Sequence, residues 1–205
     1  MTTEERQTLE SYEKIAPAWA SRHSDPNYWR TQFEKFRTLL PQGRVLDLGC
    51  GAGRDSALFI GEGYDYVGVD MSSSLLDLAR RQSPLATFLS MNMDALKFPP
   101  RAFDGFWAVA SLLHVPKDKL NAVLDEVARV VKPGGVGFVS LKEGSGERFV
   151  EGDISGDRRF FSYYEPGEFD RVIVGRGFSV VDMTRRQQQM RDAESWLEYF
   201  ITAPA

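Results

Sequence analysis

The sequence is poor in the residues that disulfide bonds and metal sites require. It contains one cysteine and two histidines in 205 residues. A single cysteine cannot form an internal disulfide bond, and a zinc or iron site needs several Cys or His ligands at short spacing. We therefore expect no disulfide framework and no metal centre, and we interpret Cys50 as a small side chain packed inside a glycine-rich turn.

Excess positive charge and long apolar runs are also missing. The formal net charge is −4 and the sequence pI is about 5.3, which argues against a nucleic acid partner because phosphate contacts need clustered Lys and Arg. The longest mainly apolar stretch, residues 106–113, is too short to cross a bilayer, and the first residues lack a secretory pattern. We expect a cytoplasmic protein without a membrane partner, and we find no signal for an oligomeric state.

What is present is the pattern of an α/β protein, and the length favours a single domain over residues 1–205. From residue 44 onward, short apolar runs alternate with helical periodicity, which predicts a mainly parallel sheet. The expected strands cover residues 44–48, 66–70, 86–91, 103–110, 136–141, 178–183 and 196–201. Residues 185–194 should join the last two strands as a hairpin connection, and helices are expected over 116–131 and 166–175.

Residues 1–40 are predicted to form a helical lid or preface to a Rossmann-like core, residues 41–205. Apolar side chains recur at helical spacing in two groups: Leu9, Tyr12, Ala16 and Trp19, then Trp29, Phe33, Phe36 and Leu40. Pro17 should interrupt the first group, so that one helix ends near Ile15 and a second starts at Pro17. We expect Trp29, Phe33 and Phe36 to lie in the core. Residues 142–165 lack periodicity and should form a loop over the carboxyl edge of the sheet.

The strongest motif is a glycine-rich turn between the first strand and a helix, residues 45–55. Gly49, Gly51 and Gly53 let the backbone turn sharply and approach a ligand. Asp47 precedes the turn, where a carboxylate would repel a pyrophosphate but would suit the ammonium group of S-adenosylmethionine (SAM). The alternative is that Asp47 only caps the turn.

Two further acidic residues follow the next strands. Asp70 is placed to accept hydrogen bonds from ribose hydroxyls, or else to cap the helix that begins near Ser72. Asp94 could accept from the adenine amino group while Met93 holds the ring face. Because the strands are parallel, these acids should converge at one edge of the sheet.

These motifs, with Phe103-Asp104 and Lys132-Pro-Gly-Gly135, resemble the ordered motifs of class I SAM-dependent methyltransferases over roughly residues 12–201. The segments 53–56, 110–116 and 159–164 resemble small bacterial methyltransferases, and the Gly-Arg turn is similar to that of tellurite-resistance and thiol methyltransferases. The resemblance implies a doubly wound, seven-stranded, mostly parallel sheet with an antiparallel last strand, SAM as cofactor, and methyl transfer to a small-molecule acceptor. The expected cofactor-binding residues are Tyr12, Asp47, Gly49, Gly51, Asp70, Met71, Met93, Asp94, Ala95 and Ala110.

Methyl transfer from a sulfonium needs mainly proximity and orientation, so a base is optional. His114 follows the fourth strand and is the candidate catalytic base, although it could instead orient the turn before Pro116 or pack beneath SAM. His23 lies in a polar turn and should be exposed to solvent. Tyr12 and Trp19 could close over the cofactor, or simply pack at helical spacing.

The expected substrate residues are Trp19, Arg159 and Tyr163. Arg159 could bind an anionic group of the acceptor, but a salt bridge to Asp153, Asp157 or Glu165 would explain it equally well. Two other classes of protein compete with a methyltransferase. An NAD(P)-dependent oxidoreductase is disfavoured by Asp47 and by Arg54, which stands where a dinucleotide motif has glycine. A non-catalytic SAM-binding protein would carry the same motifs.

Overall fold

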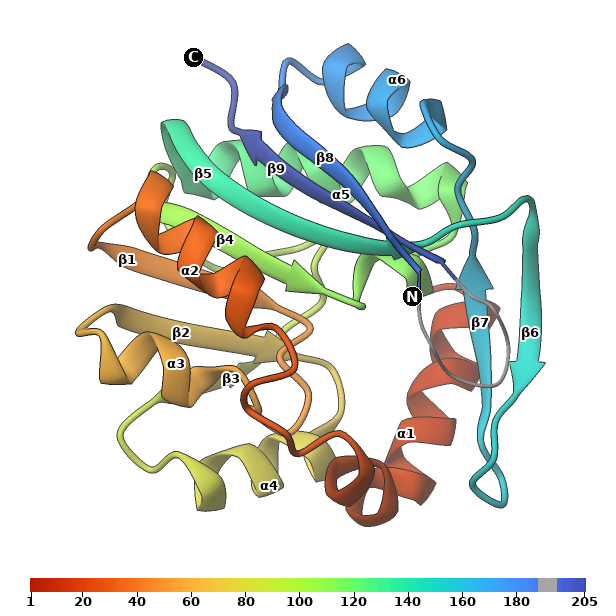
Figure 1. Cartoon of the computed structure of the whole chain (residues 1–205). Coiled ribbons are helices and arrows are strands. Elements are labelled where there is room, and N and C mark those ends of the chain that lie inside the picture. Colours follow the sequence, from red (N-terminus) through yellow and green to blue (C-terminus); the bar gives the residue numbers. More distant parts are fainter. Residues whose placement is uncertain (188–194) are drawn as a thin grey trace.

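The computed structural model describes residues 1–187 and 195–205, and its centre is a seven-stranded sheet with the order β3-β2-β1-β4-β5-β9-β8 (Figure 1). The strands are β1 (Arg44–Leu48), β2 (Asp65–Asp70), β3 (Thr87–Ser90), β4 (Phe103–Val109), β5 (Val131–Lys142), β8 (Ser179–Gln187) and β9 (Ser195–Thr202). Neighbours among β1 to β5 pair in parallel, and β9 is antiparallel to both β5 and β8. The predicted mostly parallel sheet with an antiparallel last strand is confirmed.

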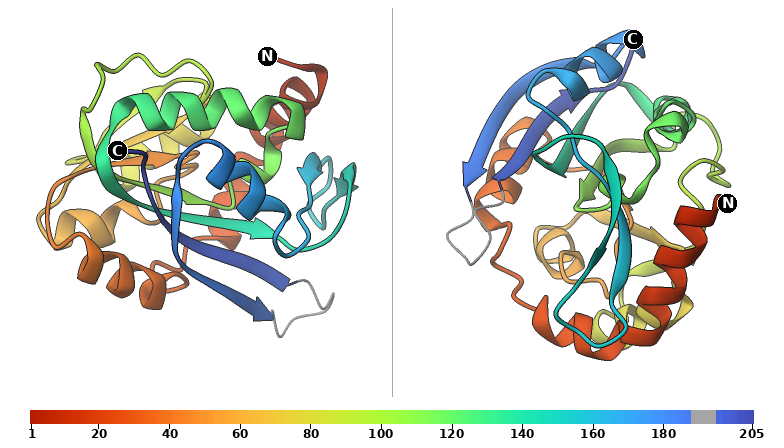
Figure 2. Two further views of the ribbon diagram at one scale, coloured as in Figure 1. Left: turned by 90° about the horizontal axis from the view of Figure 1, so that it is seen from above. Right: turned by 90° about the vertical axis from the view of Figure 1, so that its right-hand side faces the viewer.

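Helices cover both faces of this sheet, as a doubly wound fold requires. They are α1 (Thr3–Arg22), α2 (Arg30–Leu39), α3 (Ser56–Gly61), α4 (Ser73–Gln82), α5 (Lys117–Val130) and α6 (Glu168–Gly175), with the short 3₁₀ helix η1 (Leu112–His114). Figure 2 shows α2 and α3 on one side of the sheet and α5 on the other. Within the described residues, no helix is long and apolar enough to cross a membrane.

The strand order places a crevice at the carboxyl ends of β1 and β4. The chain builds β1, β2 and β3 outward in one direction and then returns to place β4 on the other side of β1. The connections that follow β1 and β4 therefore leave in opposite directions, and α/β proteins bind ligands at such a point. The glycine-rich turn follows β1 and η1 follows β4, so both border this crevice.

Apolar side chains pack on both faces of the sheet, and one part of this core lies between the sheet and α2. Phe33 and Phe36 of α2 are fully buried and meet Phe59 edge to face, and Phe36 also meets Trp107 of β4 in this way. Trp29, just before α2, is buried against Phe138 of β5. The prediction that Trp29, Phe33 and Phe36 belong to the core is confirmed, and α2 is therefore attached firmly to the sheet.

The predicted break at Pro17 is wrong, because α1 continues through it from Thr3 to Arg22. A proline inside a helix removes one backbone hydrogen bond but does not forbid helix when packing compensates. Ala16 is fully buried in a small apolar cluster with Ala52 and Leu75, and Trp19 packs against the same cluster. This packing holds the turns on both sides of the proline.

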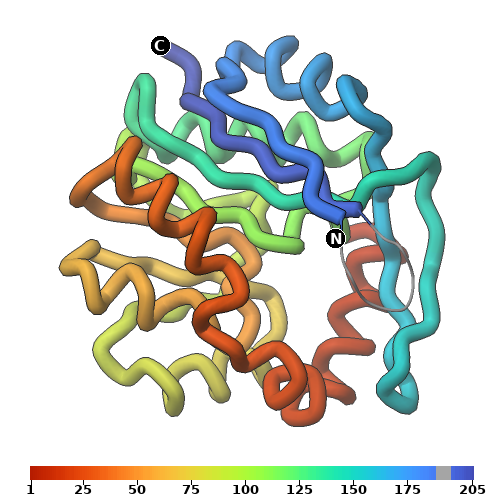
Figure 3. The backbone as a smooth tube through the Cα atoms, viewed as in Figure 1, coloured from red at the N-terminus to blue at the C-terminus, as the bar shows by residue number. Residues whose placement is uncertain are grey.

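The predicted irregular loop over residues 142–165 is also wrong, because its centre forms the antiparallel hairpin of β6 (Glu147–Glu151) and β7 (Arg158–Ser162). The segment lies at the carboxyl edge of the sheet, as expected, and Figure 3 shows the hairpin beside α1. Thr8 accepts a hydrogen bond from the Phe160 N–H (3.0 Å) and Ser11 accepts one from the Arg158 N–H (2.9 Å). The hairpin therefore depends on α1, a partner far away in the sequence.

At the C-terminal end, β8 and β9 form the expected antiparallel pair. β8 extends to Gln187, so residues 185–187 belong to the strand and not to the connection as predicted. The rest of the predicted connection, residues 188–194, lies outside the described residues.

Candidate functional site

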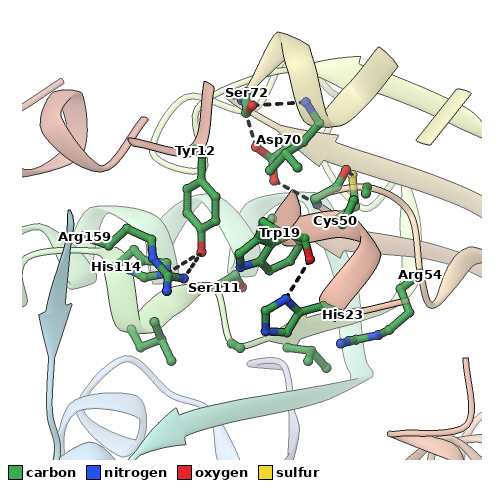
Figure 4. A pocket seen from close by; sticks show the side chains of 18 of the residues that line it. Tyr12, Trp19, His23, Cys50, Arg54, Asp70, Ser72, Ser111, His114 and Arg159 are labelled. Atoms are coloured by element: carbon green, nitrogen blue, oxygen red, sulfur yellow. Dashed lines mark hydrogen bonds between the residues drawn. The ribbon is translucent and has the colours of Figure 1, made fainter. Parts of the chain in front are cut away.

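A cavity of about 610 Å³ lies at the carboxyl edge of the sheet, between the glycine-rich turn, η1, α1 and β7 (Figure 4). Most of the predicted site residues line it: Tyr12, Trp19, Asp47, Gly49, Gly51, Asp70, Met71, Met93, Ala110, His114 and Arg159. Segments from both halves of the chain thus meet at one place. A volume of this size is within the usual range for a small-molecule site.

Three predicted site residues do not line the cavity. Asp94 and Ala95 lie further along the turn after β3, where Ala95 is exposed and its N–H bonds to the Asn92 carbonyl. Tyr163 follows the end of β7 and is buried beneath the Arg148 guanidinium, 3.7 Å from its ring centroid. Asn92 and Phe161 line the cavity instead. Asn92 was missed because strand ends are uncertain by several residues, and Phe161 was missed because β7 was not expected.

The glycines of the turn are required by backbone geometry. Gly49 and Gly51 have φ of 73° and 53°, in the left-handed region that favours glycine. A Cβ atom at Gly49 would lie 2.5 Å from the Cβ of Ser111, and one at Gly51 would lie 3.4 Å from the Trp19 ring. The absence of side chains thus lets α1 and the segment after β4 approach the turn closely.

Asp47 is a buried carboxyl group, with only 4% of its surface exposed. It accepts a hydrogen bond from the Tyr66 hydroxyl (2.6 Å), and not from the turn that it was expected to cap under the alternative interpretation. Burial, followed by the nearby charge of Asp55, raises the pKa of Asp47 to about 8. Arg54 forms its ion pair with Asp55, so Asp47 has no ion-pair partner among residues 1–187 and 195–205.

Asp70 lies at the end of β2 and faces the same cavity. Its carboxylate accepts hydrogen bonds from the N–H groups of Gly51 (2.9 Å) and Ser72 (2.8 Å), while desolvation raises its pKa. The alternative role as a helix cap belongs to Ser72, whose hydroxyl accepts from the Leu75 N–H at the start of α4. A carboxylate with two such bonds keeps lone pairs for a ligand.

Two buried polar atoms of the cavity wall lack a partner within the described part of the chain: Ser111 Oγ and Trp19 Nε1. Ser111 is 5% exposed and follows Ala110, which has an unusual positive φ of 49°. Buried polar groups are normally hydrogen-bonded because an unpaired group costs about 1 to 3 kcal/mol. Both atoms are therefore available to hydrogen-bond with polar groups of a ligand. Nothing in the sequence singles out Ser111.

His114, Tyr12 and Arg159 meet on one side of the cavity (Figure 4). His114 Nδ1 is 2.6 Å from the Phe160 carbonyl oxygen and His114 Nε2 is 2.9 Å from the Tyr12 hydroxyl. Arg159 Nη1 donates to the same hydroxyl (2.9 Å). Desolvation, with the charge of Arg159, lowers the pKa of His114 to about 3, so its ring is neutral near pH 7.

Arg159 also forms a bidentate ion pair with Asp157 (2.6 and 2.9 Å), so the salt-bridge interpretation of Arg159 is the one that the structure contains. His23 is exposed as predicted, but it also lines the cavity and stacks on Trp19 at 4.4 Å between ring centroids. Its position there was missed because it depends on α1 continuing past Pro17.

The fold and the site define a Rossmann-like protein with acids at the ends of β1 and β2, which is the arrangement for a nucleoside ligand. Residues 45–135 match the model of a methyltransferase domain. The chain is 36% identical over 103 residues to a 2-methyl-6-phytyl-1,4-hydroquinone methyltransferase of Synechocystis sp., covering 48% of this chain and 32% of the relative. The chain spans less than half the length of the first curated relatives it matches.

Two solved structures extend this comparison to the fold of nearly the whole chain. A Burkholderia thailandensis 1,6-didemethyltoxoflavin-N1-methyltransferase, crystallised with S-adenosylhomocysteine, aligns with a TM-score of 0.80 at 19% identity, covering 100% of this chain and 92% of that one. The [4+2]-cyclase SpnF aligns with a TM-score of 0.75 at 17% identity, covering 99% and 97%. The chain thus contains a segment that matches a methyltransferase domain, and it shares the fold of these solved structures.

Proposed function

We propose that this chain binds SAM in the cavity and transfers its methyl group to a small-molecule acceptor. The observation that carries the proposal is Asp47, a buried carboxyl group beside the glycine-rich turn that has no ion-pair partner within the described residues. A buried carboxylate is costly unless it is paired. The ammonium group of the methionine part of SAM is a partner of the right charge for it.

The other groups of the cavity fit the rest of SAM. The free lone pairs of Asp70 can accept from the two ribose hydroxyls, and Gly49 and Gly51 leave room for the ligand beside the turn. We assign the apolar side chains of Met71 and Met93 to the adenine ring faces, with Asn92 in place of Asp94 as the polar residue beside them. Ser111 Oγ and Trp19 Nε1 then gain partners.

Bound SAM supplies a methyl group that its sulfonium sulfur already activates, so this chain has to orient the acceptor and exclude water. α1 forms one wall of the cavity and carries Tyr12 and Trp19, whose rings meet edge to face at 5.5 Å. β7 contributes Arg159 and Phe161 from another direction. In this proposal, these walls bring the acceptor and the methyl group together.

Several aromatic residues line the rest of the cavity: Tyr28, Trp29, Phe161 and Trp196. This lining supports a small, partly apolar acceptor. The hydroquinone methyltransferase and the didemethyltoxoflavin methyltransferase to which the chain is similar agree with that class. We further propose that residues 1–205 act as one domain with the N-terminal helix as a lid. A cytoplasmic location and the absence of a nucleic acid partner stay predictions from the sequence.

Isothermal titration calorimetry with SAM, S-adenosylhomocysteine and NADH tests the binding part of the proposal. SAM should bind and NADH should not, because a pyrophosphate would face Asp47. Asp47→Asn and Asp70→Asn should each weaken SAM binding roughly tenfold or more. Asp65→Asn is a matched control, since Asp65 is exposed at the other end of β2 and pairs with Arg44. Tight NADH binding, or unchanged SAM affinity in both site variants, would refute the assignment.

Catalysis needs a separate experiment, because the [4+2]-cyclase shares this fold. The protein is mixed with SAM that carries a deuterated methyl group and with a bacterial small-metabolite extract. Mass spectrometry should then detect a metabolite that gains the labelled methyl group. SAM binding without any labelled product would instead favour a non-catalytic SAM-binding protein.

A further inference from the structure

We propose that Tyr12, and not His114, takes the proton that the acceptor loses on methylation, with His114 as the next proton carrier. This inference rests on the proposed function and concerns an acceptor that loses a proton from O, N or S. Tyr12 lies on α1, His114 on η1 and Arg159 on β7, so the cluster is assembled from three distant parts of the chain.

The Phe160 carbonyl group at one end of the cluster determines the direction of each hydrogen bond. The Phe160 carbonyl oxygen, 2.6 Å from His114 Nδ1, can only accept, so Nδ1 carries the proton of the neutral ring. His114 Nε2 is therefore an acceptor, and the Tyr12 hydroxyl donates to it over 2.9 Å. Arg159 has only donors, so its Nη1 donates to the Tyr12 oxygen.

The Tyr12 hydroxyl therefore occupies Nε2, the one ring nitrogen of His114 that can accept a proton. An acceptor in the cavity cannot bond to Nε2 without displacing the Tyr12 hydroxyl. The Tyr12 oxygen, in contrast, accepts from Arg159 and keeps a second lone pair. Tyr12 also lines the cavity. The first atom of the cluster that can receive a proton from the acceptor is thus the Tyr12 oxygen.

The acceptor atom forms a bond to the methyl carbon, and the carbon–sulfur bond breaks with its electron pair going to sulfur. The proton of the acceptor moves to the Tyr12 oxygen while the original Tyr12 proton moves to His114 Nε2. Tyr12 ends unchanged and His114 ends as an imidazolium, which later releases its proton to water.

The charges of the site favour this order of events. Arg159 beside the Tyr12 oxygen stabilises the negative charge that develops there, and it is held in place by the bidentate contact with Asp157. A positive charge appears on His114 as the positive charge on sulfur disappears, so the total charge of the cavity is unchanged. Burial and the Arg159 charge keep the pKa of His114 low, so the imidazolium forms only briefly and gives up its proton readily.

The test uses the acceptor that the labelling experiment identifies, with Tyr12→Phe, His114→Gln and the control Tyr64→Phe. Tyr64 likewise has a hydrogen-bonded hydroxyl, which donates to the Leu40 carbonyl oxygen, but it lies outside the cavity lining. Tyr12→Phe should lower kcat about 100-fold or more with SAM affinity changed less than threefold, and Tyr64→Phe should leave both nearly unchanged. The wild type should show a solvent deuterium isotope effect on kcat that Tyr12→Phe lacks.

The outcomes separate this proposal from the proposed function. If the wild type labels a product and Tyr12→Phe is equally fast, the proton relay is wrong while the methyltransferase proposal stands. A full rate in Tyr12→Phe with a large loss in His114→Gln would make His114 the direct base. An acceptor that loses no proton would also overturn the relay. If the wild type binds SAM but labels nothing, the proposed function fails first.

Discussion

Burial strongly shifts the pKa of two acid–base groups in the cavity, Asp47 and His114. Burial raises the pKa of Asp47 to about 8 and lowers that of His114 to about 3, so both side chains are mainly uncharged at neutral pH. The free cavity is thus less charged than its sequence suggests. Binding a cation changes this balance for Asp47, and the change can be measured.

Binding of SAM near pH 6.5 should release a proton from Asp47, because the ammonium group stabilises the carboxylate form. SAM affinity should consequently rise between pH 6 and pH 7.5, by at most about tenfold per pH unit. Calorimetry in two buffers of different ionisation enthalpy counts the released protons. Asp47→Asn should release none, and a wild type with the same result would show that Asp47 does not contact the ammonium group.

The stability of the protein in acid should depend on His114. Its pKa is about 3 in the folded chain and about 6.5 in an unfolded chain. Between these values the unfolded state binds more protons, so the free energy of unfolding falls as the pH falls from 6.5 towards 3. At pH 5 this should cost about 2 kcal/mol relative to pH 7. Urea unfolding of His114→Gln should show a much smaller pH dependence. Desolvation also lowers the pKa of His23, but its side chain is exposed, so His23→Gln should reduce the pH dependence less than His114→Gln does.

The sequence predicts the residues that lie directly on the glycine-rich turn and at strand ends. Asp47 and Asp70 could be placed because a short stretch of chain and the parallel sheet determine their positions. The place of Ser111 in the site could not be predicted, because Gly49 comes close to it only in the folded chain. The Tyr12 to His114 hydrogen bond joins α1 to η1, so no local pattern indicates it.

At the scale of elements, α1 is fastened to its surroundings by polar side chains on two sides. Glu13 accepts hydrogen bonds from the Ser74 hydroxyl and the Ser74 N–H at the start of α4, where a carboxylate also interacts favourably with the helix dipole. Although burial opposes it, these bonds lower the pKa of Glu13. Thr8 and Ser11 bind the backbone of β7. The helix therefore links α4 to the hairpin.

Glu13→Gln should loosen this link, because the neutral side chain loses its interaction with the start of α4. We expect a loss of about 0.5 to 1 kcal/mol in the free energy of unfolding and faster amide exchange in α1. Glu10→Gln is the matched control, since Glu10 lies on the same helix with an exposed side chain. Equal behaviour of the two variants would mean that packing around Ala16 alone holds the helix.

The elements also show where sequence patterns fail. The strands of the central sheet could be predicted because buried parallel strands are nearly continuous apolar runs. The hairpin of β6 and β7 was missed because its residues are mostly polar, and its stability comes from the Phe149 and Phe160 rings and from α1. The continuous helix through Pro17 was missed because the local helix preference of proline is unfavourable, and tertiary packing outweighs it in the folded chain.

At the scale of the whole molecule, two segments outside the central sheet, α1 and the hairpin of β6 and β7, form walls of the cavity. Trp19 of α1 covers the glycine-rich turn, and Tyr12 of α1 contacts His114. Under the proposed function, α1 and the hairpin are two of the walls that border the path of SAM and the acceptor. The lid hypothesis therefore does not need the short, broken helices expected from Pro17, because a continuous helix can move as a unit.

If α1 is a lid, SAM should slow amide hydrogen exchange selectively across residues 8–22. Binding supplies partners for Trp19 Nε1 and Ser111 Oγ, and it adds contact surface beneath Tyr12, so the docked position of α1 gains stability that the rest of the chain does not. Exchange in α2, which packs on the sheet, serves as the internal reference. A Thr8→Val, Ser11→Ala double variant should raise exchange across residues 8–22 without SAM and enlarge the difference that SAM makes. If residues 8–22 are equally protected with and without SAM, α1 is a fixed wall, and ligands must then enter past the hairpin of β6 and β7.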